Sequence, residues 1–168
     1  PSVLSAMRCR ELCAQYGIQV ELLAVLDRAN ADTKKIATEI AGDAQLKLIY
    51  TDVGDCGCAR NEGAKVAAGR YVAFLDGDDL WSANWLYECF KRAASESEPT
   101  AYHPEICAYF GAGEHIYVHV DMEDGDYSPV VLGMQNYWTA LVFSSRQLFL
   151  DCPFEIASHS EGLAYEDW

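Results

Sequence analysis

Runs of apolar residues long enough to form a strand recur through the first hundred residues of the chain. They span residues 18–27, 46–51 and 70–76. In the first run Val20 and Leu22 begin an alternation that places apolar side chains on one face of a strand. The third run, "RYVAFLD", is apolar almost throughout, which is typical of a strand buried on both faces in a parallel sheet.

The segments around these runs carry helical signals. The predicted helices span residues 1–16, a short part of the polar segment 28–45, 59–69 and 82–94. Gly17 and Gly69 fit helix ends, and Ser82 fits a helix cap. The alternation of helices and strands indicates an α/β sandwich with a mainly parallel sheet. Ligands bind such sheets outside the carboxyl ends of the strands, where Asp27 and Asp76 both fall.

The pattern changes beyond Ser95. Residues 105–111, 114–120 and 137–145 look like strands, and they are separated by turns rich in Gly and Asp. No linker divides this part from the first hundred residues. We therefore expect one domain over residues 1–168, in which the second part extends the same sheet.

Composition narrows the classes of partner. The chain has 168 residues, and 51% of them are hydrophobic, so we expect a folded core. The net charge of −14 argues against binding to a nucleic-acid backbone or to an anionic membrane surface, but it is compatible with a cation site. The seven cysteines are an odd number, and Cys56 and Cys58 form a C-x-C rather than a zinc-type pair. Reduced thiols and a cytoplasmic location are therefore expected.

The acidic turn Asp76-Gly77-Asp78-Asp79 follows the third predicted strand directly. Carboxylates this close together can converge on one hard cation, with phosphate oxygens of a substrate completing its ligand shell. Gly77 lets the backbone turn and lets a ligand approach. A solvated acidic turn is the simpler interpretation. A calcium-binding EF-hand loop is rejected because its sixth and twelfth positions would be Trp81 and Tyr87.

A strand-terminal D-x-D also resembles the nucleophile loop of haloacid-dehalogenase-type phosphatases, with Asp76 as the nucleophile. That family usually has Thr or Val two residues after the second Asp, where this chain has Leu80. Its motif usually follows the first strand, whereas two strands are predicted before this one. The phosphatase is therefore the alternative rather than the leading hypothesis.

Three further groups carry candidate chemistry. Asp27 ends a predicted strand, where a carboxylate can accept hydrogen bonds from a base or ribose. Arg60 and Asn61 lie near the head of a predicted helix, where donors favour an anionic ligand. Asp167 lies in the terminal "YEDW", where an acidic side chain beside aromatic rings can act as a proton acceptor. Each has a plain structural alternative, namely an Asx turn, a helix cap and a surface acidic turn.

In order, "VLDRANAD", "CARNEGAKVAAGRYVAFLDGDDLW" and "YEDW" resemble the motifs of inverting family-2 glycosyltransferases of the GT-A fold. The resemblance implies a Rossmann-like, three-layer α/β/α sandwich with a mixed, mainly parallel sheet. It implies a nucleotide-binding half over residues 1–100 and an acceptor and base half over 101–168. It also implies transfer of a sugar, with inversion, from a nucleotide-sugar donor to an acceptor hydroxyl, and a UDP-linked donor is the expected one.

The resemblance assigns roles to individual residues. Asp27 would contact the base of the donor, and Asp167 would be the general base. The other implied site residues are Asp32, Arg60 and Asn61 in the nucleotide pocket, and Asp76, Asp78 and Asp79 at a divalent metal, Mn²⁺ or Mg²⁺. In the segment before Asp167, an aromatic ring such as that of Trp138 can stack on a sugar, although core packing is the commoner role.

The chain departs from the family pattern in three places. Arg28, Ala29 and Asn30 replace the family's D-G-S. The family's opening strand would precede Pro1, and its last helices would follow Trp168, so we expect a piece of a longer protein, whose other segments can attach it to the inner membrane face. The acceptor can be a polysaccharide, a lipid carrier, a protein or a small glycan. A non-catalytic nucleotide- or glycan-binding module is a further alternative.

Overall fold

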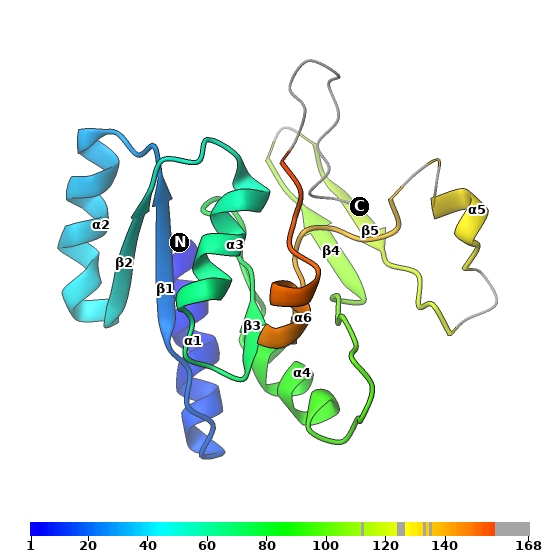
Figure 1. Ribbon diagram of the computed structural model, residues 1–168. Coiled ribbons are helices and arrows are strands. Elements are labelled where there is room, and N and C mark those ends of the chain that lie inside the picture. The colour runs from blue at the N-terminus through cyan, green and yellow to red at the C-terminus, as the bar shows by residue number, and fades with distance from the viewer. Residues whose placement is uncertain (112, 124–126, 133, 135, 157–168) are drawn as a thin grey trace.

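The computed structural model describes residues 1–111, 113–123, 127–132, 134 and 136–156 (Figure 1). Its first part alternates helices and strands, as the sequence predicts. The elements are α1 (Ser2–Gln15), β1 (Leu22–Asp27), α2 (Ala31–Ala44), β2 (Leu46–Thr51), α3 (Cys56–Val66), β3 (Tyr71–Ala73) and α4 (Trp85–Ala93). Its second part adds β4 (Ile106–Tyr109), β5 (His115–Val118), α5 (Pro129–Leu132), β6 (Phe143–Ser145) and α6 (Arg146–Asp151).

Only one of the described strand pairs is parallel. β1 pairs with β2 in parallel, in a register that runs from Leu22 opposite Leu46 to Asp27 opposite Thr51. β3 pairs antiparallel with β6, and β4 pairs antiparallel with β5. The β3–β6 pairing joins the second part of the chain to the first, as expected, whereas β4 and β5 form a separate two-stranded ribbon.

A large open cavity lies between the β1–β2 pair and the β3–β6 pair. All of β1 and all of β3 line it, and its volume is about 1690 Å³. In the described structure β1 pairs only with β2, and β3 only with β6. The cavity therefore follows two strand edges along their length, and Asp27 and Asp76 are among the residues that line it.

Several predicted boundaries were wrong. Segment 28–45 forms the 14-residue helix α2 rather than a loop with a short helix, because the side chain of Asn30 accepts a hydrogen bond from the amide of Thr33 and so caps it. α3 begins at Cys56, where Asp55 caps it, and ends at Val66, before Gly69. The residue before α4 is Asn84 rather than the predicted cap Ser82.

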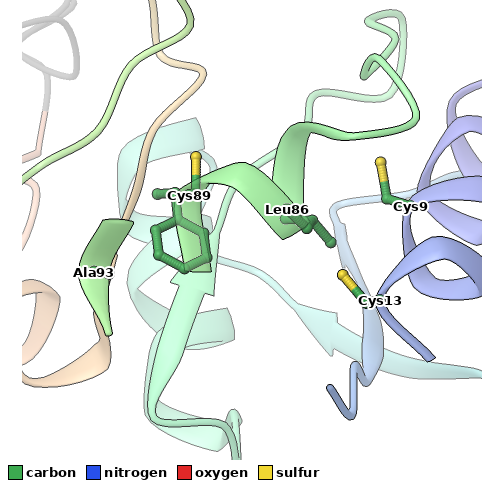
Figure 2. Close-up of a cluster of buried hydrophobic side chains, with 6 residues drawn as sticks. Cys9, Cys13, Leu86, Cys89 and Ala93 are labelled. Atoms are coloured by element: carbon green, nitrogen blue, oxygen red, sulfur yellow. The ribbon is translucent and has the colours of Figure 1, made fainter. Parts of the chain in front are cut away.

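A cluster of small and sulfur-containing side chains forms the core between α1 and α4. Figure 2 shows Cys9 and Cys13 on α1 opposite Leu86 on α4, with Cys89 and Ala93 further along that helix. Burial raises the pKa of the Cys9 thiol to about 11 and that of Cys89 to about 12. All seven cysteines are free thiols, in agreement with the prediction. Among the described helices, none has the length and apolar composition needed to cross a membrane.

Candidate functional site

Asp27 is held by donors from the loop that follows β2. Its Oδ1 accepts hydrogen bonds from the Thr51 hydroxyl (2.9 Å) and from the amide of Val53 (2.8 Å), and its Oδ2 accepts one from the amide of Gly54 (2.8 Å). Partial burial raises the pKa of this carboxyl, but these bonds outweigh burial and leave it below its ordinary value. Asp27 is therefore a fixed, charged acceptor at the end of β1.

Arg60 links α3 to the acidic turn after β3. Its Nη2 atom donates to both carboxylate oxygens of Asp76, at 2.9 and 3.0 Å. The Arg60 side chain is only 9% exposed, whereas that of Asp76 is 44% exposed. The buried cation thus fixes one face of the Asp76 carboxylate and leaves part of the side chain accessible.

The acidic turn is short and open on one side. The amide of Asp79 donates to the carbonyl of Asp76 (3.2 Å), and the hydroxyl of Ser2 donates to the carbonyl of Gly77 (2.7 Å). A Cβ on Gly77 would meet no atom within 4 Å among the described residues. Burial and the neighbouring charges of Asp76 and Asp78 raise the pKa of Asp79, so this turn concentrates negative charge.

The turn has the donor chemistry for a hard divalent cation. No group of three or more metal-ligating side chains is arranged around a common point in the described part of the chain. However, Mg²⁺ commonly uses one or two carboxylates together with substrate phosphate oxygens. Asp76, which lines the cavity, and Asp78, with one residue between them in the same turn, fit that limited requirement.

The structure brings three of the predicted residues to one cavity. Asp27, Arg60 and Asp76 all line the space between β1 and β3. Asp32 does not line it, and lies exposed in the first turn of α2, where its charge favours the helix N-terminus. Asp167 lies outside the described residues, so its role stays a prediction.

Asn61 makes an unexpected connection. Its Nδ2 donates to the carbonyl of Phe154 (2.8 Å), and its Oδ1 accepts from the amide of Phe154 (3.0 Å). This pairing joins α3 to the segment after α6, 93 residues along the chain. The sequence offers no local signal for it, because Asn61 sits where a helix-head ligand is expected.

Trp138 belongs to an aromatic cluster in the second part of the chain. Its ring stacks on His103 (centroids 5.7 Å apart) on one side and on Tyr127 (6.1 Å) on another, and its Nε1 donates to the carbonyl of Val120 (2.8 Å). Trp138 and His103 also line a second cavity of about 790 Å³, which Phe154 reaches from the other side. In this arrangement Trp138 has a packing role, and its stacking on a sugar stays a prediction.

The sequence did not predict the contact between Arg28 and Gly54. Arg28 has a left-handed backbone conformation (φ 46°), and its Nε donates to Asp52 (2.7 Å). Its guanidinium lies so close to Gly54 (φ +72°) that a Cβ there would overlap it. The glycine in "TDVGD" was the available signal, because a residue with positive φ after a strand often marks a ligand loop.

This arrangement is that of an α/β protein with a polar ligand site at the carboxyl ends of its strands. The sequence model of the family described as Glycosyl transferase family 2 matches residues 8–160 of this chain. The chain therefore belongs to this family, and it has the GT-A fold. Membership decides against the phosphatase alternative.

The curated relatives are bacterial glycosyltransferases and polysaccharide biosynthesis proteins. The Escherichia coli UDP-Glc:alpha-D-GlcNAc-diphosphoundecaprenol beta-1,3-glucosyltransferase WfgD is 39% identical over 66 residues, which are 38% of this chain and 26% of WfgD. The uncharacterized glycosyltransferase EpsJ of Bacillus subtilis is 32% identical over 92 residues, 54% of this chain and 26% of EpsJ. The succinoglycan biosynthesis protein ExoO of Rhizobium meliloti is 36% identical over 81 residues, 48% of this chain and 23% of ExoO.

The matches cover about a quarter of the length of these curated relatives. The crystal structure of S. aureus TarS 1-349 superimposes with a TM-score of 0.58 at 17% identity, over 88% of this chain and 45% of that one. At this identity the likeness concerns the fold alone.

Proposed function

We propose that the protein containing this chain transfers a sugar from a UDP-sugar to an acceptor hydroxyl with inversion at the sugar carbon. The observation that carries the proposal is the placement of Asp27 at the carboxyl end of β1 and of the Arg60–Asp76 pair in the turn that follows β3. A fixed acceptor on one side and an acidic turn on the other suit the two ends of a nucleoside diphosphate. Family membership supplies the reaction class.

Asp27 is proposed to hold the base of the donor. Its Oδ2 accepts a hydrogen bond from the amide of Gly54, and a carboxylate oxygen has capacity for another. Its lowered pKa keeps it ionised at neutral pH, so it presents an acceptor rather than a donor. An N–H group of a base such as uracil is a suitable partner for it.

Asp76 and Asp78 are proposed to hold a divalent cation, Mn²⁺ or Mg²⁺, with Asp79 beside them. When bound, the cation neutralises the charge that develops on the departing diphosphate. Arg60 holds the Asp76 carboxylate in one orientation, and its positive charge offsets part of the acidity of the turn. The open space at Gly77 leaves room for phosphate oxygens.

Asp167 is proposed as the general base that takes the proton of the acceptor hydroxyl. Direct displacement requires the base and the leaving diphosphate on opposite faces of the sugar carbon. The proposal for Asp167 rests on the sequence motif "YEDW". Asp32 and Asn61 are the remaining residues that the family resemblance places near the nucleotide.

The acceptor is proposed to be a lipid-linked or growing polysaccharide at the cytoplasmic membrane face. The name of WfgD specifies a UDP-Glc donor and a diphosphoundecaprenol-linked acceptor. ExoO is named for succinoglycan biosynthesis. These relatives favour a bacterial polysaccharide product over a protein or a small glycan.

The test is a titration of the full-length protein with UDP-, GDP- and CMP-linked sugars, with and without Mn²⁺, followed by thermal melting and transfer to a lipid-linked acceptor. We expect a UDP-sugar to raise the melting temperature more with Mn²⁺ than without it, because a ligand bound to the folded state stabilises it. Binding without turnover would favour the non-catalytic module. A lack of stabilisation by any nucleotide sugar would contradict the proposal.

A further inference from the structure

The side-chain amide of Asn61 and the backbone of Phe154 exchange two hydrogen bonds. Both polar ends of the amide are used, one as donor at 2.8 Å and one as acceptor at 3.0 Å. The geometry resembles the exchange of two hydrogen bonds between paired strands, with a side chain in place of one backbone. The segment after α6 is thereby tied to α3.

The Phe154 ring contacts two residues that support the acidic turn 76–79. It lies against Phe74, with ring centroids 5.8 Å apart, and against Phe149, at 6.3 Å. The Arg60 guanidinium carbon lies 5.8 Å from the centroid of the Phe154 ring. Phe74 comes two residues before Asp76, and Arg60 donates to Asp76, so the ring contacts both supports of that carboxylate.

We propose that Asn61 and Phe154 form a latch that positions the Arg60–Asp76 pair and fixes where the chain leaves the site after α6. The catalytic consequence rests on the proposed transferase function. Asn61 is a positioning residue in this inference, not a ligand of the donor.

Three observations favour a latch over a direct nucleotide contact. The Asn61 amide is already engaged at both ends, and Asn61 is not among the residues that line the cavity between β1 and β3. Moreover, both Asn61 and Arg60 contact Phe154. Asn61 binds its backbone, and the Arg60 guanidinium lies near its ring. A residue that only bound the nucleotide would have no reason to share Phe154 with its neighbour.

The experiment uses the full-length protein with Asn61→Ala, Phe154→Leu and the double variant. Asn84→Ala is the matched control, because Asn84 is exposed and its side chain makes no cap hydrogen bond. Hydrogen exchange of the amide of Phe154 reports the latch directly and does not depend on activity. Donor KM and kcat are measured with a UDP-sugar and Mn²⁺.

We expect Asn61→Ala to remove the exchange protection of the Phe154 amide and to lower kcat by about 10–100-fold with little change in donor KM, as losses of supporting contacts around a metal site do. The double variant should lose no more than the worse single variant, because residues that act as one unit are not additive. Asn84→Ala should match the wild type in both readouts.

Different failures give different conclusions. Unchanged exchange at Phe154 in Asn61→Ala would overturn the latch even if the protein were inactive on every donor. Lost exchange protection with unchanged kcat would overturn its positioning role. A rise in donor KM alone, or independent and additive effects of the two substitutions, would show that Asn61 contacts the nucleotide instead. Inactivity of the wild type on all nucleotide sugars would count against the proposed function, not against the latch.

Discussion

The two parts of the chain treat ionisable groups in opposite ways. In the first hundred residues Asp27 is surrounded by three hydrogen-bond donors, and Asp76 by the buried guanidinium of Arg60. In the second part His103 is largely buried, and burial together with the nearby His119 lowers its pKa to about 4. In the first part these contacts hold two carboxylates at or just after strand ends, whereas in the second part the surroundings of His103 favour its neutral form.

His119 shows how the second part keeps an imidazole neutral. Its Nδ1 contacts the carbonyl of Pro104, and its Nε2 accepts a hydrogen bond from the amide of Thr139 (3.1 Å). A carbonyl needs a donor and an amide needs an acceptor, so the ring is the neutral tautomer with its proton on Nδ1. The comparison shows that one domain can hold carboxylates at its strand ends, where a ligand can reach them, and can also hold neutral imidazoles that serve only as structural hydrogen-bonding groups.

The largest expected effect is that of Asp76→Asn on sugar transfer. Loss of this carboxylate removes a proposed metal ligand and weakens the pairing with the Arg60 Nη2 atom, so we expect transfer to fall by at least about 100-fold. The free energy of unfolding should fall by about 1–3 kcal/mol. Initial rates and urea titrations measure both. Asp52→Asn is the control, because Asp52 is 86% exposed, and wild-type rates for Asp76→Asn would refute the assignment.

The second effect is an acid sensitivity set by His103. Its pKa is lower in the folded state than the ordinary value of 6.5, so the neutral form stabilises the fold above about pH 6.5. This stability is lost as the pH falls from about 6.5 towards 4, by about 3 kcal/mol in total. Urea titrations across this range should show a shallower loss for His103→Phe than for the wild type. The control His115→Gln, at an exposed site, should keep the wild-type slope.

The third effect is that of Asp27→Asn on stability. In the wild type the donors around residue 27 bind carboxylate oxygens, and in the variant some of them would face an amide nitrogen instead. We expect the free energy of unfolding to fall by about 1–3 kcal/mol at pH 7. Because the pKa of Asp27 is lowered on folding, its contribution is present above the ordinary Asp range and disappears as the pH falls through the lowered pKa. The difference between wild type and variant should therefore shrink in acid. A constant difference would contradict the charged-acceptor role.

The smallest expected effects are those of alanine substitutions at two glycines, Gly54 and Gly77. Gly54→Ala places a Cβ at a positive φ and against the Arg28 guanidinium, so we expect it to lower the free energy of unfolding by about 1–2 kcal/mol. Gly77→Ala meets open space and should change stability by less than about 0.5 kcal/mol. If Gly77 provides clearance for a ligand, its alanine variant should still bind the donor more weakly. Equal donor affinity, measured by melting shifts, would remove that role.

The sequence could predict where the charged residues fall in the first part of the chain. Apolar runs end at Asp27 and Asp76, and the carboxyl end of a strand is where an α/β sheet binds its ligand. The prediction is confirmed for β1, which ends at Asp27, because burial imposes a local period that a short window of sequence displays. It is wrong for the run 70–76, which forms only the short strand β3, half-buried and paired antiparallel with β6 rather than buried on both faces in a parallel sheet. The same local signals misjudged the length of α2 and the start of α3, since the caps Asn30 and Asp55 were not recognised.

The sequence by itself determined the alternation of helices and strands and the family motifs at their ends. Only the tertiary structure decided that β3 pairs antiparallel with β6, that Arg60 donates to Asp76, and that Asn61 binds Phe154. The physical reason is separation along the chain. Local periodicity records which face of an element is buried, whereas partners 16 to 93 residues apart are chosen by packing of the whole domain.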